Sequence, residues 1–122
     1  MAGWYPVGMT DQQREVQDRR GLRFSFEADA ELVLESPPQK LSARVTELSF
    51  RGCFLETSVD LKEQQRMRVK IFHDNKYFES LAEVMYVRQN GVGLLFGNME
   101  PHFRGVLQGW ILSALDNQAK TE

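Results

Sequence analysis

The sequence predicts a mainly β fold, either a sandwich or a small closed barrel, followed by one C-terminal α-helix. Three observations support this prediction. Apolar and polar residues alternate in several short segments between residues 22 and 97, which is typical of half-buried strands. Turn residues separate these segments. After Pro101 the apolar spacing changes to that of a helix. A chain of 122 residues fits one domain of this kind.

The first strand is expected from Leu22 to Glu35. Apolar side chains occupy every second position from Phe24 to Leu34, as in a strand with one face toward a core. Residues 36–39 should end the strand, because two prolines there remove amide donors and fix φ.

Five further strands are expected from the same alternation, and each is bounded by a turn. Ser49–Gly52 is a tight connection, His73–Lys76 is a turn, and Gln89–Gly91 contains the Asn-Gly pair that is typical of hairpins. Many short strands with turns between them indicate a sandwich or a barrel. The expected strands are residues 41–46, 54–57, 66–71, 77–88 and 92–97.

The last segment predicts an amphipathic helix over about 101–116. Pro101 suits a first helical position, and the residues after it repeat at helical spacing. Such a helix could cover one end of a barrel or pack against a partner. The apolar stripe comprises Phe103, Val106, Leu107, Trp110, Ile111, Ala114 and Leu115.

The expected domain covers residues 19–117, with the barrel over about 22–97 and a tail over 118–122. Residues 1–18 are interpreted as a flexible arm. Thr10 resembles a helix cap, but the residues that follow are almost all polar, so any helix there would be short.

Composition excludes several classes of protein. With 42% hydrophobic and 26% charged residues, the chain is typical of a soluble globular protein rather than a disordered one. A net charge of -2 argues against binding of nucleic acid through bulk charge. The single cysteine, Cys53, excludes an internal disulfide framework and favours a reducing compartment. No apolar run would span a membrane and no secretory signal is evident, so the expected location is the cytoplasm.

Catalysis is not expected. His73, His102 and Cys53 lie apart in the sequence, none beside a plausible nucleophile or base, and solitary residues of these types are usually structural or simply exposed. No glycine-rich phosphate loop occurs. Gly91 and Gly93 are better explained by a hairpin and a closely packed strand. We therefore predict no enzymatic activity and no cofactor.

Arg19, Arg20 and Arg23 form the first candidate binding cluster. The planar donor fork of arginine can hold a phosphate or the O6/N7 edge of guanine, and its flat face can stack. The cluster lies where the arm meets the first strand, beside Gly21. An alternative is a solvated cluster that pairs with neighbouring acidic residues.

The second candidate lies between two expected strands and comprises Glu47, Ser49 and Gly52. The carboxylate could accept paired donors from a guanine edge, and the hydroxyl could donate to phosphate. Gly52 could supply a backbone angle that other residues reach only with strain. The alternative is an ordinary Ser/Gly connection between strands.

Taken together, these motifs resemble a PilZ domain. The pattern Arg19-x-x-x-Arg23, then Glu47-x-Ser49-x-x-Gly52, then the strand from Gly91 to Phe96 and a final helix covers about residues 18–116. The resemblance implies a six-stranded antiparallel barrel that binds the bacterial second messenger cyclic di-GMP. Glu47 departs from the family pattern, which prefers Asp or Asn at this position.

The resemblance also implies roles for individual residues. Arg19 and Arg23 would form a clamp on phosphates and guanine faces, with Arg20 as an auxiliary. Ser49 and Gly52 would form the second motif with Glu47. Further ligand-binding candidates are Arg51 and Tyr86.

The leading hypothesis is therefore a single-domain cyclic di-GMP receptor whose arm and surface change on binding and regulate an unidentified downstream protein. One alternative is a PilZ-like interaction module that no longer binds nucleotide, which the Glu at position 47 supports. A barrel that binds RNA or single-stranded DNA is disfavoured, because the sequence lacks a clear aromatic and basic surface strand.

Overall fold

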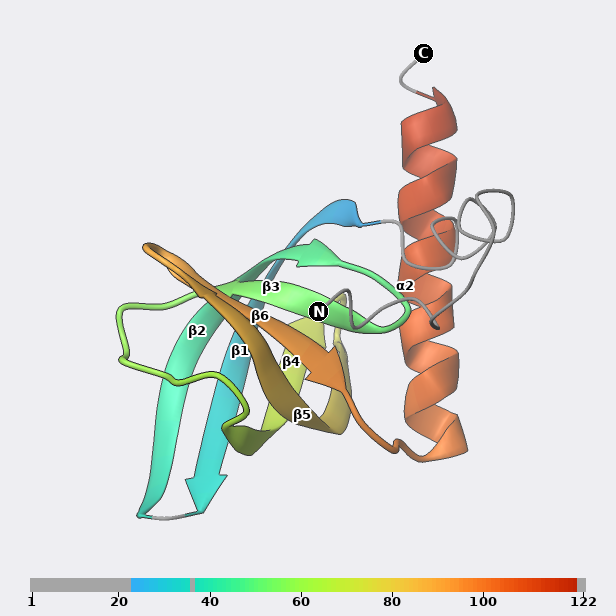
Figure 1. The fold of residues 1–122 in the computed structure, drawn as a ribbon. Coiled ribbons are helices and arrows are strands. Elements are labelled where there is room, and N and C mark those ends of the chain that lie inside the picture. The colour runs from blue at the N-terminus through green and yellow to red at the C-terminus, as the bar shows by residue number, and fades with distance from the viewer. Residues whose placement is uncertain (1–22, 36, 121–122) are drawn as a thin grey trace, which may run out of the picture.

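The protein is a closed six-stranded barrel with one helix across an end (Figure 1). The structure, a computed structural model, describes residues 23–35 and 37–120. All six strand pairs are antiparallel, in the order β1-β2-β3-β6-β5-β4. Of the two predicted alternatives, a sandwich and a closed barrel, the structure confirms the barrel. The strands are β1 (Phe24–Glu35), β2 (Pro38–Leu48), β3 (Gly52–Glu56), β4 (Arg66–His73), β5 (Lys76–Arg88) and β6 (Gly91–Phe96).

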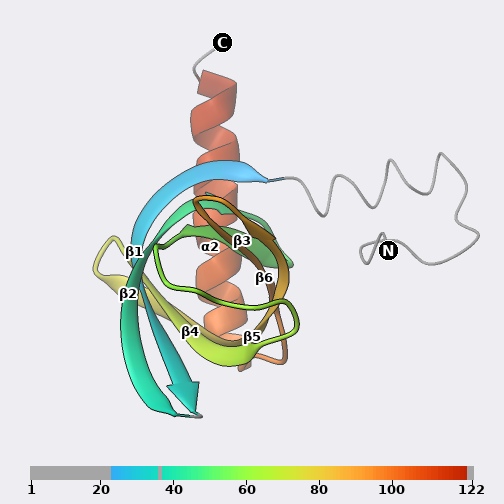
Figure 2. The same cartoon turned by 60° about the vertical axis from the view of Figure 1, so that its left-hand side comes forward.

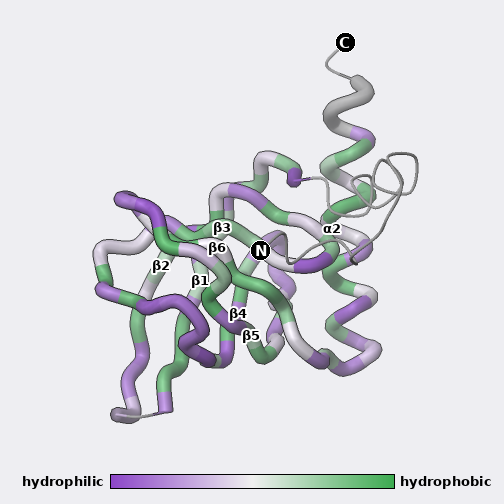
Figure 3. The backbone as a smooth tube through the Cα atoms, viewed as in Figure 1, coloured by the Kyte–Doolittle hydropathy of each residue, from purple (hydrophilic) through white to green (hydrophobic). Residues whose placement is uncertain are grey.

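The core of the barrel follows directly from the alternation in the sequence. Along β1 the even-numbered side chains from Phe24 to Leu34 are all buried, and the intervening ones are exposed or half-buried. The alternation of hydrophobic and hydrophilic residues is visible along the strands in Figure 3. Fully buried side chains from every strand meet inside the barrel, among them Leu32, Val45, Leu55, Val69, Ile71, Phe78 and Val92.

Helix α2 (Pro101–Lys120) crosses one end of the barrel (Figures 1 and 2). Its Trp110 ring packs on Phe26 of β1, with the ring centroids 5.4 Å apart, and edge-on against His73 at 5.5 Å. Nearer the start of the helix, the Phe103 ring packs against Tyr77 at 5.3 Å. The helix therefore closes one end of the barrel, which is one of the two arrangements predicted for it.

The predicted apolar stripe of the helix is correct in its centre and wrong at its C-terminal end. Leu107, Trp110 and Ile111 are buried, and Phe103, Val106 and Ala114 pack partly against the core. Leu115 is 41% exposed. The helix also continues to Lys120 rather than ending near residue 116, because nothing in residues 117–120 is a strong helix breaker.

The observed strand bounds differ from the predicted ones by up to three residues, and the largest difference is at the start of β2. β2 begins at Pro38, not Leu41, and Pro38 pairs with Glu35. A proline is tolerated as the first residue of a strand, so the prolines stand in the hairpin and do not shorten β2. β3 begins at Gly52, two residues before the predicted start.

The predicted turn at His73–Lys76 and the predicted hairpin at Gln89–Gly91 both join paired strands, but they differ in backbone geometry. Asp74 and Asn75 have φ values of 56° and 62° between the paired residues His73 and Lys76, as in a two-residue hairpin loop. In the other hairpin Gly91 is already a strand residue that pairs with Arg88. A Cβ there would overlap the carbonyl oxygen of Leu55, so close packing requires this glycine.

No helix in the described part of the chain is long and apolar enough to cross a membrane. Within residues 23–35 and 37–120, no group of three or more His, Cys, Asp or Glu side chains is placed to hold a metal ion.

Candidate functional site

Three irregularities in strand pairing surround the candidate site. The register shifts between Ser25 and Ala28 in the β1–β2 pair, between Val45 and Glu47 in the β2–β3 pair, and between Val84 and Tyr86 in the β5–β6 pair. A β-bulge bends its strand and re-aims the side chains beside it. The bulges therefore set the directions of Glu47 and Tyr86 at one region of the barrel wall.

Arg23 and Glu47 form an ion pair at this region. The Nη1 atom of Arg23 lies 3.7 Å from Oε1 of Glu47, and each side chain is 46% exposed. The pairing of Phe24 with Leu48 and of Ser25 with Glu47 brings the residue that precedes β1 beside the end of β2. The candidate basic group and the candidate acidic group are thus direct neighbours.

The turn from Ser49 to Gly52 is organised by the serine side chain. The Ser49 hydroxyl donates to the carbonyl oxygen of Gly52 and accepts from the amides of Arg51 and Gly52, at 3.1, 3.3 and 3.1 Å. The Ser49 amide also donates to the Gly52 carbonyl at 2.9 Å. Ser49 is 3% exposed. Its single hydroxyl hydrogen is used inside the turn, so the predicted donation to phosphate is not what this geometry provides.

Gly52 is required for a different reason from the one predicted. Its φ lies outside the left-handed region, and a Cβ would overlap the carbonyl oxygen of Leu94 on β6. Close approach of two strands, not an unusual backbone angle, therefore requires a glycine here.

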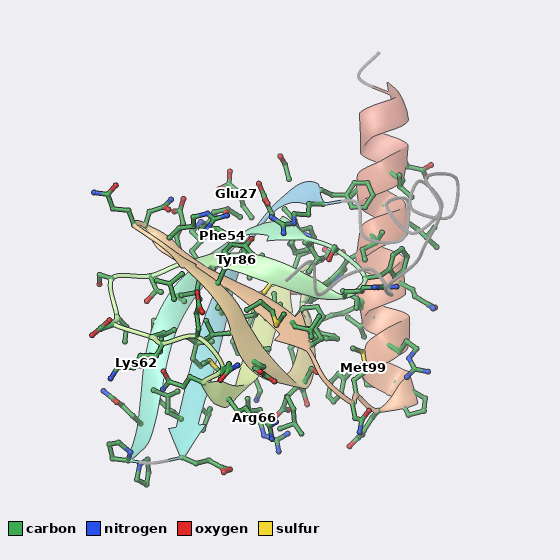
Figure 4. The ribbon with its side chains drawn as sticks, viewed as in Figure 1. Glu27, Phe54, Lys62, Arg66, Tyr86 and Met99 are labelled. Atoms are coloured by element: carbon green, nitrogen blue, oxygen red, sulfur yellow. The ribbon has the colours of Figure 1, made fainter. Side chains whose placement is uncertain are left out.

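An aromatic and basic cluster stands next to the turn. Gly93 on β6 lies opposite Phe54 on β3 and Tyr86 on β5, and a Cβ at Gly93 would overlap the Tyr86 ring. The absence of a side chain lets the tyrosine ring lie over the strand. The Phe54 and Tyr86 rings are stacked with their centroids 6.3 Å apart, and both are labelled in Figure 4.

Two guanidinium groups approach the Tyr86 ring. The Cζ atom of Arg88 lies 4.4 Å from the ring centroid and that of Arg23 lies 5.5 Å from it, both within the range of cation–π attraction. The ring therefore gathers two positive charges beside the Glu47 carboxylate.

A shallow depression of about 10 Å³ adjoins this cluster and is bordered by Arg23, Glu47, Ser49, Gly52 and Tyr86 among others. The depression is too small to enclose a nucleotide, so a ligand of that size would lie on the barrel surface. A larger groove of about 480 Å³ runs past Val33, Arg66, Leu81 and Glu83 and contains none of the predicted site residues. Because ligand chemistry depends on the polar groups that converge at a site, we take the depression as the candidate site.

The structure brings five of the eight predicted residues together, namely Arg23, Glu47, Ser49, Gly52 and Tyr86. Arg51 is half-buried in the adjoining turn, where its amide donates to Ser49. Arg19, Arg20 and the predicted arm over residues 1–18 lie outside the described residues.

Sequence reasoning missed Phe54, Arg88 and the role of Gly93 at this cluster. Their proximity depends on which strands are neighbours and on the register between them. The alternating pattern could have shown that Phe54 faces outward, but not that Tyr86 lies beside it.

Cys53 borders the depression, whereas His73 and His102 are not among the residues that line it. Cys53 is buried in β3, and burial raises the pKa of its thiol from 9.0 to about 12, because desolvation disfavours the thiolate. His73 packs against the rings of Phe26 and Trp110, which also pack on each other. His102 is exposed, so the three residues agree with the prediction that they are structural or simply exposed.

Comparison with known proteins identifies the family to which the chain is similar. The sequence matches the PilZ domain over residues 17–113. No significant match was found among curated proteins.

Solved structures share the fold at low sequence identity. The PilZ domain of YcgR from Escherichia coli with c-di-GMP has a TM-score of 0.66 and 17% identity, covering 82% of this chain and 93% of that one. The PilZ domain of CeSA from a cellulose-synthesizing bacterium has a TM-score of 0.60 and 9% identity, covering 75% and 95%.

The inhibitor of motility MotI/DgrA from Bacillus subtilis has a TM-score of 0.66 and 12% identity, and the match covers 78% of this chain but 50% of that one. With the family match spanning most of the sequence and the same barrel in these structures, the chain belongs to the PilZ domain family.

Proposed function

We propose that this protein is a non-catalytic cyclic di-GMP receptor that binds the nucleotide on the barrel surface around the depression. The observation that carries the proposal is the convergence of Arg23, Glu47 and Tyr86 from three different strands or their ends. A PilZ domain of similar fold from Escherichia coli is described with c-di-GMP, which supports the choice of ligand.

Each group offers chemistry that fits one part of this ligand. The Glu47 carboxylate accepts hydrogen bonds from the N–H donors on a guanine edge, which is a charge-assisted interaction. Arg23 and Arg88 supply guanidinium forks for phosphate. Phe54 and Tyr86 provide flat apolar surface on which a base can stack.

We assign Ser49 and Gly52 an indirect role. They hold the turn that follows Glu47 against β6, and so they fix the position of the carboxylate. Arg51 and the peptide groups of the same turn border the ligand surface.

Arg19 and Arg20 complete the proposed site from the N-terminal side. On ligand binding, Arg19 closes onto the nucleotide together with Arg23, and residues 1–18 change position and present a new surface to a downstream protein. Since cyclic di-GMP is a bacterial second messenger, the proposed setting is the bacterial cytoplasm.

Isothermal titration calorimetry with cyclic di-GMP tests the proposal, with GTP and single-stranded RNA as control ligands. Arg23→Ala should weaken binding by about ten- to a hundredfold, since it removes a charge-assisted contact of roughly 1.5–3 kcal/mol. Arg66→Ala is the matched control, because Arg66 is an exposed arginine that lines the larger groove. Absence of binding to folded protein at high micromolar ligand would refute the proposal, and a loss confined to Arg66→Ala would move the site to that groove.

Tryptophan fluorescence tests the movement of the N-terminal residues. The chain has two tryptophans, Trp4 and Trp110, and Trp110 is buried under the barrel end. A ligand-induced change that disappears in Trp4→Phe would support the movement. A change that persists in this variant would contradict it.

A second candidate is an interaction module that binds no nucleotide. The Arg23–Glu47 pair favours it, because the two charges already satisfy one another. Calorimetry separates the two functions, since the module would give no heat with cyclic di-GMP.

A further inference from the structure

Helix α2 carries apolar side chains on the side that faces away from the barrel. Leu112 is 60% exposed, and Leu115, at the edge of this side, is 41% exposed. The barrel side of the helix is formed by the buried residues Leu107, Trp110 and Ile111. A helix that packs on a single core needs one apolar stripe. The second apolar side has no counterpart among the described residues.

Gly105 and Gly109 lie on the same outward side, one helical turn apart. Glycine is unfavourable in a helix interior relative to alanine, and a Cβ at either position would meet no atom of the described fold within 4 Å. Nothing in the barrel therefore requires these glycines. Small residues four apart allow the backbone of another helix to approach closely.

The C-terminal part of α2 extends beyond the barrel (Figures 1 and 2). Among the side chains of the helix that are described, residues 101–116, Ile111 is the last buried one, and Ala114 is half-buried. Short helices are marginal in water unless they pack on something. An external contact on the outward side would stabilise this part of the helix.

We propose that the outward side of α2 pairs with the same surface of a second copy of this chain, with the two helices antiparallel. Small residues stand at one end of this surface and leucines at the other, so the surface is complementary to itself after a two-fold rotation. With the axis near residue 110, Leu115 of one copy lies over Gly105 of the other. Leu112 then lies level with Gln108.

The charges on the helix favour the antiparallel orientation. Arg104 and Asp116 are both exposed, and the same axis places Arg104 of one copy level with Asp116 of the other. In a parallel pair, Arg104 would instead lie level with Arg104 of the other copy and Asp116 with Asp116, and like charges repel. A single helix pair is a small interface, so the dimer should form in a concentration-dependent manner.

Sedimentation velocity of the full chain over a range of concentrations tests the pairing. The mass should rise from one chain to two, and Leu112→Glu should weaken the dimer at least tenfold. Ser113→Glu, which adds the same charge in the same turn but off the stripe, should leave the dimer unchanged. Circular dichroism checks that both variants fold. A wild-type protein that stays a single chain at high micromolar concentration would overturn the proposal, including the case in which residues 1–22 cover the surface instead.

Gly105→Leu separates a close helix contact from a free surface. If the surface pairs as proposed, the larger side chain occupies the place of Leu115 from the second copy and the dimer dissociates. If the surface is free, the substitution only improves helix propensity and raises the melting temperature without a change in mass, which would contradict the proposal.

Cysteine cross-linking tests the orientation. Gln108→Cys and Leu112→Cys are made in separate chains, mixed and oxidised. Cys53 should not interfere, because it is buried and its thiol pKa is raised. An antiparallel pair predicts mostly the mixed dimer, whereas a predominance of like-with-like dimers would exclude this orientation.

Discussion

The guanidinium of Arg23 lies 3.7 Å from the carboxylate of Glu47, across the start of β1 and the end of β2. Both side chains are about half exposed, and exposed ion pairs contribute little to stability. The pair therefore serves to position two groups beside the Tyr86 ring more than to hold the barrel together. A ligand that binds both groups needs to break only a weak contact.

Substitutions at Glu47 should change ligand affinity and leave stability nearly unchanged. Glu47→Ala should weaken cyclic di-GMP binding by about ten- to a hundredfold, the effect of losing a charge-assisted bond of roughly 1.5–3 kcal/mol. Glu47→Asp should tighten binding, because the shorter side chain withdraws from Arg23 and restores the residue that the family prefers. Calorimetry and thermal melting measure both effects. Unchanged affinity in both variants would remove residue 47 from the site.

Gly93→Ala should weaken binding without a direct contact between Gly93 and the ligand. The new methyl group would overlap the Tyr86 ring and displace it, and the two arginines that approach this ring would lose their anchor. We expect an affinity loss like that of Tyr86→Ala, about five- to a hundredfold for a stacking contact of roughly 1–3 kcal/mol.

Gly97→Ala is the matched control for this variant. A Cβ at Gly97 would make an ordinary contact of 3.5 Å with Leu81, away from the candidate site. If Gly93→Ala and Gly97→Ala bind the ligand equally well, the aromatic cluster does not take part in binding.

Cys53 should make the protein less stable at alkaline pH. Burial raises the thiol pKa from 9.0 to about 12, so between these values the unfolded chain loses this proton while the folded chain keeps it. The contribution of the protonated Cys53 thiol to the free energy of unfolding is fully present below about pH 9. Above that pH it falls by roughly 1.4 kcal/mol per pH unit. The pH dependence can be measured by denaturant unfolding of wild type and Cys53→Ala between about pH 8 and 10.5. This range runs from below the ordinary thiol pKa into the interval in which only the unfolded chain loses the proton. Equal pH dependence in the two proteins would contradict the assignment.

The fold could be predicted almost fully from the sequence, because strand alternation depends only on neighbouring residues. Phe24 to Leu34 alternate in the sequence and are buried in the same rhythm in β1. The prediction is wrong where burial depends on contacts between residues that are distant in the sequence. Leu115 follows Ile111 at the spacing of a core residue, but it lies at the edge of the outward side of the helix and is 41% exposed.

The candidate site could be predicted only in part for the same reason. Glu47, Ser49 and Gly52 are close in the sequence and carry a recognisable motif, so they could be found. Arg88 and Phe54 meet Tyr86 through strand register and a bulge, which no local pattern encodes. The sequence also did not show that the Ser49 hydroxyl donates to the backbone of its own turn.

Ser49 therefore provides a test that separates support of the turn from direct ligand contact. Ser49→Ala removes the acceptor of two amides in a residue that is 3% exposed. Leaving such buried groups unsatisfied should cost about 1–3 kcal/mol of unfolding free energy, which denaturant titration can measure. Ser49→Thr keeps the hydroxyl and should retain most of the stability if the added methyl group fits. Ligand affinity should fall with the alanine variant only as far as the turn loosens around Glu47. A large loss of affinity in Ser49→Ala with unchanged stability would show instead that the hydroxyl contacts the ligand, and our account of this turn would then be wrong.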